Sequence, residues 1–230
     1  MLEDLKKKVY DANLELVASK LVIYTFGNVS AIDREKGLIC IKPSGVDYEK
    51  MRASDMVLVD MEGRTVEGDL RPSSDTKTHL ALYKGFSEIG AVAHTHSRYA
   101  TAWAQAKKPI PCLGTTHADY FYGQVPCTRV IPDTKIEKDY ELETGNLIIE
   151  AFEGIDYRRI KAVLVACHGP FTWGRDADEA VFVSSILESI AHTAIYSMML
   201  DPKAENIKKT LLDRHYLRKH GSGAYYGQVK

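Results

Sequence analysis

The sequence predicts an α/β fold: a three-layer α/β/α domain with a mixed, mainly antiparallel central sheet. Short apolar runs typical of strands cluster early in the 230 residues, and segments with helical periodicity flank them. The turns between successive strands are short and hairpin-like, which favours antiparallel pairing over a regular parallel winding. No repeat, low-complexity run or linker divides the chain, so we expect residues 1–230 to form a single domain.

The N-terminal part is predicted to form one helix followed by two strand pairs. Leu5, Val9 and Leu16 belong to an apolar stripe with helical spacing, and charged residues lie between its members. Alternating apolar runs bounded by turn residues then predict strands. The predicted strands are 21–25 and 38–42, with a turn at 33–37 between them, and a further pair around residues 61–64.

Helices and strands alternate along the rest of the chain. A helix is predicted to begin at Ser73-Ser74-Asp75, because serine and aspartate are preferred N-cap residues. Ser97 is expected to cap a short helix, and Asp176 is expected to begin the longest one. The other predictions are a strand ending at 94–96, helices at 97–103, 135–152, 176–200 and around 211–217, strands at 162–167 and 171–173, a loop at 109–126, and a glycine-rich turn at 221–223 before the tail.

The composition excludes several classes of protein. Hydrophobic residues make up 45% and charged residues 27%, as in ordinary globular proteins, and the net charge of −1 gives no electrostatic reason to expect nucleic acid or an anionic membrane as partner. No apolar segment approaches the ~20 residues of a membrane span, and the acidic start lacks the pattern of a secretory signal. The four cysteines have no C-x-x-C spacing and are interpreted as reduced, mostly buried thiols, with Cys167 packed inside. We therefore expect a cytoplasmic protein.

Three histidines follow two of the apolar runs. His94 and His96 end the run 89–93, and His168 ends the run 162–167. The side-chain period of a strand is two residues, so His94 and His96 are expected on one face, roughly 6.5–7 Å apart along the backbone. Two imidazoles so placed, with a third from another strand end, match the three-ligand pattern of catalytic zinc sites. Ordinary hydrogen-bonded histidines are the alternative.

Asp75 is the natural fourth group for such a metal, although the residues alone favour an ordinary helix-capping role for it. Small-residue turns elsewhere are able to hold a phosphate, because glycine allows close approach and serine hydroxyls donate hydrogen bonds. These turns are Gly27-Asn28, Ser44-Gly45 and Ser73-Ser74, with Lys42 as an added charge. The chain has neither a G-x-x-x-x-G-K-[ST] loop nor a G-x-G-x-x-G fingerprint, so a nucleotide is not indicated.

Two further segments carry reactive side chains. Residues 115–120 place hydroxyls, an imidazole and the Asp119 carboxylate in a proline-bounded loop, where function is common. The tail contains His215 and Tyr226 beside flexible glycines. Its position favours a frayed end. A tail tyrosine can still act as an acid if it docks into the cleft of a neighbouring subunit.

With these residues in place, the chain resembles the class II (zinc) aldolase/epimerase family over essentially its whole length. The matching motifs are GNVS at 27–30, IKPSGV at 41–46, PSSDT at 72–76, HTHS at 94–97, GTTHADY at 114–120, HGP at 168–170, HYLRKHG at 215–221 and AYYGQ at 224–228. Motifs of this length and order are far more specific than a histidine pair.

The resemblance implies one Zn²⁺ per subunit, held by His94, His96 and His168 with Asp75 at or near it. It implies acid–base roles for Asp119 and Tyr226, and a homotetramer with active sites between subunits. His215 would orient the tail or help to move a proton. The implied phosphate and substrate residues are Gly27, Asn28, Ser44, Gly45, Ser73 and Ser74.

The implied activity is epimerisation of a pentulose phosphate, interconverting L-ribulose 5-phosphate and D-xylulose 5-phosphate by cleavage and re-formation of the C3–C4 bond. The related fuculose-phosphate-type aldolases commonly carry glutamate in place of Asp75, so the shorter aspartate favours an epimerase. Three alternatives stay open: such an aldolase, a non-catalytic interaction module like the adducin head domain, and a structural zinc site. The last is disfavoured, because structural sites are usually cysteine-rich. Manganese or cobalt would also suit the ligand set.

Overall fold

A computed structural model describes residues 2–221 and 223–227. Ser222 of the predicted glycine-rich turn and Gln228 of the AYYGQ motif lie outside these residues. The helices are α1 (Leu2–Ala18), α2 (Thr76–Gly85), α3 (Arg98–Gln105), α4 (Thr115–Ala118), α5 (Asp133–Ala151), α6 (Ala177–Leu200) and α7 (Lys209–His220), with a 3₁₀ turn η1 (Ala53–Asp55). The strands are β1 (Asn28–Asp33), β2 (Leu38–Ile41), β3 (Val57–Asp60), β4 (Thr65–Glu67), β5 (Ala91–His94), β6 (Ala162–Leu164) and β7 (Pro170–Gly174).

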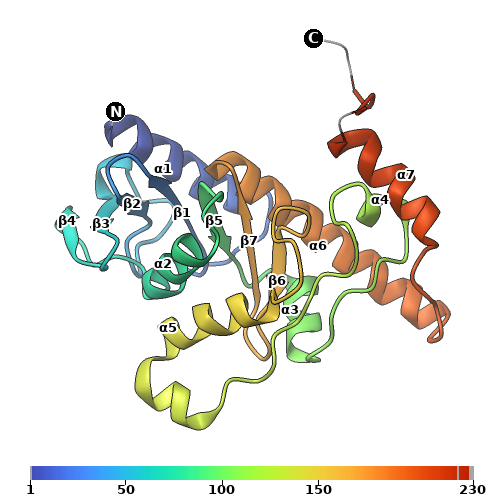
Figure 1. The fold of residues 1–230 in the computed structure, drawn as a ribbon. Helices are drawn as coiled ribbons and strands as arrows, with labels where there is room; N and C mark the ends of the chain where they lie inside the picture. The colour runs from blue at the N-terminus through green and yellow to red at the C-terminus, as the bar shows by residue number, and fades with distance from the viewer. Residues whose placement is uncertain (1, 222, 228–230) are drawn as a thin grey trace.

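One sheet of seven strands forms the middle of the fold, in the order β4-β3-β2-β1-β5-β7-β6 (Figure 1). Every pair of neighbouring strands is antiparallel. The hairpins β1–β2 and β3–β4 arise from short turns, as the sequence predicts. The structure therefore confirms the α/β class and the mainly antiparallel sheet.

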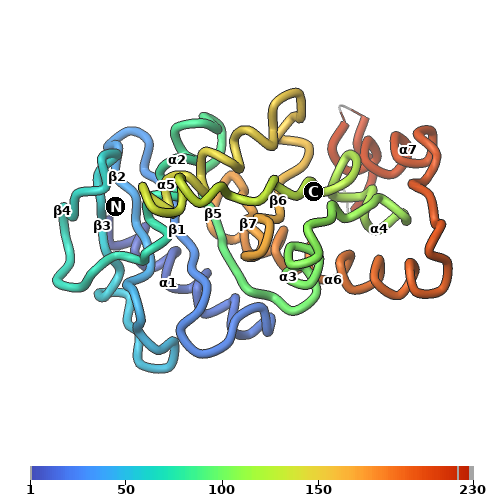
Figure 2. Tube along the Cα trace, turned by 90° about the horizontal axis from the view of Figure 1, so that it is seen from below, coloured from blue at the N-terminus to red at the C-terminus, as the bar shows by residue number. Residues whose placement is uncertain are grey.

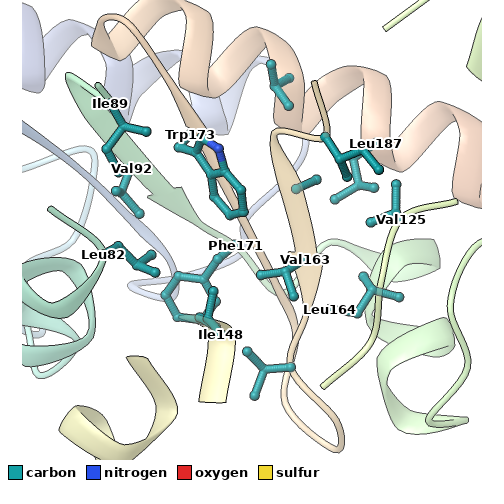
Figure 3. Close-up of a cluster of buried hydrophobic side chains, with 14 of the residues drawn as sticks. Leu82, Ile89, Val92, Val125, Ile148, Val163, Leu164, Phe171, Trp173 and Leu187 are labelled. Carbon is teal, nitrogen blue, oxygen red and sulfur yellow. The ribbon is translucent and has the colours of Figure 1, made fainter. Parts of the chain in front are cut away.

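Helices cover both faces of this sheet, α1 and α6 on one and α2 and α5 on the other (Figures 1 and 2). Ala91 and Ala93 of β5 pack with α1, whereas Val92 faces the opposite core with α2. His94 continues this alternation onto the α2 side. Aromatic and branched side chains fill that core, including Phe171 and Trp173 of β7 (Figure 3).

The first predicted strand, residues 21–25, is wrong. These residues form a loop, and the strand begins at Asn28 instead. Tyr24 has φ 54° and Gly27 has φ 76°, so two residues in the left-handed region interrupt any extended run. The alternation of Val29 and Ala31 with Ser30 is the signal that identifies the true strand.

Two helix starts use different caps. Asp176 caps α6 as predicted, and its side chain accepts a hydrogen bond from the Glu179 backbone N–H at 2.8 Å. Ser97 occupies the N-cap of α3 without a side-chain bond. The Glu188 carboxylate from α6 accepts from the N–H groups of Tyr99 and Ala100 instead, at 2.8 and 2.9 Å. A distant carboxylate thus replaces the expected local cap.

Two expectations from composition also need correction. Helix α6 is long and apolar enough to cross a membrane by length and composition, although no segment was expected to be. Here Ala180, Leu187 and Ile190 of α6 are buried in the protein. Cys167 is exposed and has φ 66°, so it is not a buried packing residue.

The buried His117 of α4 is expected to make stability depend on pH. Burial lowers its pKa from 6.5 to about 4, although a hydrogen bond to the Gly123 carbonyl partly opposes this. Below pH 6.5 the unfolded chain takes up a proton that the folded chain does not. The free energy of unfolding should therefore fall as the pH decreases, by up to about 3 kcal/mol near pH 4. His117→Gln keeps a donor for Gly123 and should flatten this slope in urea unfolding curves; parallel slopes would contradict the assignment.

Candidate metal centre

Three imidazoles meet at the end of β5. The ligand nitrogens of His94, His96 and His168 all lie within 4.8 Å of one another. The ring centroids are 4.9 Å apart for His94 and His96, 4.7 Å for His94 and His168, and 5.0 Å for His96 and His168. Strand β5 ends at His94, so His96 reaches the cluster from the loop and not from the strand.

The fold brings the two histidine segments together through β7. His94 pairs with Phe171 in the β5–β7 ladder, and the turn before β7 carries His168. Gly169 allows the close approach, because a Cβ there would lie 2.7 Å from the Thr95 carbonyl oxygen. The strained Cys167, at φ 66°, turns the chain into this loop.

His94 is prepared to bind a metal through Nε2. His94 Nδ1 lies 3.0 Å from the Pro170 carbonyl oxygen, so it carries the proton and leaves Nε2 as an acceptor. His168 Nδ1 lies 3.1 Å from the Tyr140 hydroxyl. Burial, together with its histidine neighbours, lowers the pKa of His168 to about 3, and burial lowers the pKa of His96. Neutral imidazole is the form that coordinates metals.

Asp75 faces the same cluster and does not cap its helix. It occupies the N-cap position of α2, but its side chain makes no capping hydrogen bond. Its Oδ2 instead accepts from Asn28 Nδ2 at 2.7 Å. Burial alone would raise the pKa of Asp75. Electrostatic attraction to His94 and His79, together with the hydrogen bond from Asn28, outweighs burial and lowers the pKa. The capping interpretation is therefore wrong, and the carboxylate is an ionised neighbour of the imidazoles.

These groups fit a bound Zn²⁺. Zinc takes imidazole nitrogens at about 2.0–2.1 Å in a tetrahedral arrangement, so three ligands must lie within a few ångströms of one another. Three converging neutral imidazoles beside one carboxylate satisfy this requirement. Cysteine is missing from this ligand set, which distinguishes it from the usual structural zinc sites.

The phosphate-type turns line the same cavity of about 450 Å³. The two serine turns are joined, because the Ser73 N–H donates to the Lys42 carbonyl at 3.0 Å and Pro43 pairs with Pro72. All the predicted site residues except three line this cavity. Those lining it are Gly27, Asn28, Lys42, Ser44, Gly45, Ser73, Ser74, Asp75, His94, His96 and His168.

Lys42 and Asn28 give the cavity two distinct polar groups. The Lys42 side chain is buried, which lowers its pKa to about 8, and its ammonium lies 4.7 Å from the Tyr48 ring centroid. It can supply positive charge to an anion near neutral pH. Asn28 Oδ1 is buried and has no hydrogen-bond partner among the described residues. An acceptor left in this state is able to receive a donor from a bound ligand.

Tyr140 and Glu141 also line the cavity, although no motif in the sequence identifies them. Helix α5 is kinked at Asp139, whose φ of −167° and ψ of 84° are not helical. Lys77 holds this residue by an ion pair of 2.7 Å, and Thr78 Oγ1 donates to the Glu141 carbonyl at 2.6 Å. The periodicity of a helix contains no signal for such a kink, because the residues that fix it belong to α2.

No motif in the sequence identifies His79 either. It is fully buried beneath the cluster, and burial lowers its pKa to about 3. Its Nδ1 lies 2.7 Å from Ser30 Oγ, which in turn lies 2.8 Å from the Tyr83 hydroxyl. This chain of polar groups links β1, which carries Ser30, to α2, which carries His79 and Tyr83.

Removing the Tyr140 hydroxyl should weaken metal binding. Outer partners orient a ligating histidine, and their loss typically lowers metal affinity about 10–100-fold. We expect Tyr140→Phe to show such a loss in competition with a chelator, because His168 loses its partner at 3.1 Å. Tyr10→Phe, on α1, is a matched control. Equal affinities for the wild type and Tyr140→Phe would show that the hydroxyl has no orienting role.

Three predicted residues lie elsewhere in the chain. Asp119, His215 and Tyr226 do not line the cavity. They gather around α4 and α7, at the end of the molecule away from β1–β4 (Figures 1 and 2). Arg218 donates to both Asp119 oxygens, at 3.0 and 2.8 Å, and His215 Nδ1 lies 3.0 Å from Asp119 Oδ1.

This second cluster is electrostatically organised around one carboxylate. Burial would raise the pKa of Asp119, but hydrogen bonds from Arg218 and His215 outweigh it, and the pKa is lowered. The Tyr226 side chain is 61% exposed, and its ring lies 4.1 Å from Lys219 Nζ and 4.9 Å from Arg218 Cζ. The imidazole cluster and the group of Asp119, His215 and Tyr226 are therefore separate within one chain.

Comparison with known proteins identifies relatives along nearly the full length. Residues 7–195 match the Class II Aldolase and Adducin N-terminal domain. The chain is 51% identical over 227 residues to L-ribulose-5-phosphate 4-epimerase UlaF of Salmonella paratyphi B (strain ATCC BAA-1250 / SPB7), covering 99% of this chain and 100% of that protein. The protein of the same name from Salmonella choleraesuis (strain SC-B67) gives the same values.

Solved structures show the same architecture. An L-fuculose 1-phosphate aldolase superposes with a TM-score of 0.78 at 26% identity, over 92% of this chain and 94% of that one. L-fuculose 1-phosphate aldolase from Glaciozyma antarctica PI12 gives a TM-score of 0.77 at 21% identity, over 96% and 84%. The second likeness shows the fold alone.

Proposed function

Since the chain belongs to the family of the class II aldolase and adducin N-terminal domain, we propose that it is a zinc-dependent enzyme that epimerises L-ribulose 5-phosphate to D-xylulose 5-phosphate. The observation that carries this proposal is the 51% identity, over 99% of the chain, to proteins named L-ribulose-5-phosphate 4-epimerase. The cavity supports it independently, because phosphate-type turns and three metal-binding imidazoles line the same space.

The substrate itself dictates the route. C4 of a 2-ketose phosphate is β to the ketone, so removing its hydrogen would leave a carbanion without resonance stabilisation. Cleavage of the C3–C4 bond avoids this difficulty. A base takes the C4 hydroxyl proton, the C3–C4 electrons remain on the three-carbon fragment, and C4 becomes the aldehyde of glycolaldehyde phosphate. Rotation of that aldehyde and re-formation of the bond invert C4.

The residues of the cavity divide this work. His94, His96 and His168 would hold the Zn²⁺, with Asp75 beside them. Zinc, when bound, supplies Lewis-acid stabilisation of the negative charge that develops on the ketose oxygens, worth several kcal/mol. Lys42 and the turns 27–28, 44–45 and 73–74 bind the phosphate and keep the aldehyde fragment close to its partner.

The C4 oxygen changes side during inversion, so proton-transfer groups are needed on both sides of the reacting centre. Asp119 and Tyr226 are the proposed pair, with His215 orienting the tail. They lie outside the cavity of their own chain, which supports completion of each site by a neighbouring subunit in a homotetramer. Contact with the neighbour would also have to redirect Arg218, because a carboxylate paired with arginine is a weak base.

Two further parts of the proposal concern the whole chain. A single domain over residues 1–230 is supported by the continuous seven-stranded sheet. A cytoplasmic location is supported by four cysteines that are all free.

The proposal is tested by following L-ribulose 5-phosphate with the zinc-loaded protein. We expect D-xylulose 5-phosphate to form, with loss of activity after chelation and recovery with Zn²⁺. Release of dihydroxyacetone and glycolaldehyde phosphate in stoichiometric amounts would instead identify an aldolase. If the protein binds zinc but converts no L-ribulose 5-phosphate, it is neither an epimerase nor an aldolase for this substrate.

A further inference from the structure

The loop before β1 carries an exposed apolar surface next to the cavity. Ile23, Tyr24 and Phe26 are 62%, 82% and 51% exposed. Large apolar side chains gathered on a surface mark a place of contact. Of these three, only Phe26 lines the cavity that contains the imidazoles and the phosphate-type turns.

The backbone of Phe26 is held while its ring stands at the edge of the cavity. The Tyr48 hydroxyl lies 3.0 Å from the carbonyl oxygens of both Phe26 and Gly27, and the Phe26 N–H donates to the Ile23 carbonyl at 3.1 Å. At Gly27, with φ 76°, a Cβ would lie 2.8 Å from the His94 carbonyl oxygen. These contacts fix the loop against β5 and present one ring to the site.

The ring of Phe26 lies beside a metal-binding imidazole. Its centroid is 6.0 Å from that of His96, with the planes tilted by 36°, and Tyr24 packs on it edge-on at 6.5 Å. The serine and glycine turns of the cavity can form hydrogen bonds with a ligand, whereas the Phe26 ring has no polar atom that could form one. The cavity therefore has a polar part that can bind a phosphate and an apolar part beside the imidazoles.

We propose, on the basis of the proposed epimerisation, that the Phe26 ring forms the wall of the cavity that retains the two-carbon aldehyde. It would do so while the aldehyde rotates to present its opposite face. Between cleavage and re-formation, the aldehyde must rotate without leaving. A polar wall would hydrogen-bond its oxygen and favour one face, whereas an aromatic wall encloses it and excludes water without fixing its orientation. Phe26 thus determines whether the fragment recombines or escapes, and so whether the chain behaves as an epimerase or as an aldolase.

The test compares the two fates of the substrate in zinc-loaded full-length protein. L-ribulose 5-phosphate is supplied, and D-xylulose 5-phosphate and free glycolaldehyde phosphate are quantified together. We expect Phe26→Ala to raise the ratio of free aldehyde to epimer at least about tenfold, because closure around a reacting fragment commits it to the next step. Zinc content should remain that of the wild type, since Phe26 is not a ligand.

Two control variants make the result specific. Phe26→Leu keeps a large apolar side chain without a hydroxyl and should keep a ratio near that of the wild type. Ile23→Ala removes another exposed apolar side chain of the same loop, one that does not line the cavity, and should leave the ratio of free aldehyde to epimer unchanged. An unchanged ratio in Phe26→Ala, or loss of its zinc, would overturn the retention role. If the wild type binds zinc but converts no L-ribulose 5-phosphate, both the proposed function and the role of Phe26 are refuted. If the wild type is active and Phe26→Ala releases no more free aldehyde than the wild type, only the role of Phe26 is refuted.

Discussion

His96→Asn should lose bound zinc and turnover together. The variant removes one of three imidazoles whose ligand atoms lie within 4.8 Å, and the other two cannot hold the ion with comparable affinity. Losing a residue that only hydrogen-bonds to a metal ligand already lowers metal affinity about 10–100-fold. Losing the ligand itself should therefore lower zinc affinity more than about 100-fold. Metal analysis after dialysis and the epimerisation rate on the same sample check this expectation.

A matched histidine elsewhere separates this effect from general damage. His192 of α6 stacks on Tyr99 at 3.7 Å, outside the cavity, so His192→Asn should keep both zinc and activity. Excess Zn²⁺ should restore part of the His96→Asn activity if affinity alone is affected. Stoichiometric zinc and normal turnover in His96→Asn would remove this histidine from the metal site.

Tyr226→Phe should keep zinc and slow epimerisation by about 10²–10⁴-fold, the usual contribution of one acid–base group. The hydroxyl lies outside the metal cavity of its own chain, so its loss leaves the imidazole cluster intact. Tyr225→Phe is the matched control, because Tyr225 is adjacent and also 61% exposed. A normal rate in Tyr226→Phe would remove this hydroxyl from the mechanism.

Mixing the two inactive variants tests whether subunits share a site. If His96 and Tyr226 of one site come from different subunits, exchange between His96→Asn and Tyr226→Phe chains should rebuild complete sites. Random assembly of equal amounts should restore about one quarter of the wild-type sites. No recovery after demonstrated exchange would place both groups of each site within one chain.

Much of the site could be predicted because its residues follow local patterns. The apolar run before His94, the turn chemistry of Ser44-Gly45 and the serines at 73–74 are each visible over a few residues, and the structure gathers them around one cavity. The antiparallel hairpins of the sheet were predictable for the same reason, since short turns link β1 to β2, β3 to β4 and β6 to β7.

The rest depended on contacts that no local pattern encodes. The strand predicted at 21–25 failed because Tyr24 adopts φ 54°, and the cap of α3 comes from Glu188, far along the chain. Asp75 has the sequence signature of a cap, yet Asn28 directs its carboxylate towards the histidines. Tyr140 enters the cavity only because α2 holds the kink of α5.

The cleavage of the C3–C4 bond is tested most directly by turnover in deuterium oxide. L-ribulose 5-phosphate is converted by the zinc-loaded protein, and the recovered sugar phosphates are examined by NMR at C4. A route through bond cleavage never detaches the C4 hydrogen, so we predict no deuterium at that carbon after many turnovers. Deuterium at C4 in step with epimerisation would contradict the account, because it would show that the hydrogen itself is removed and returned.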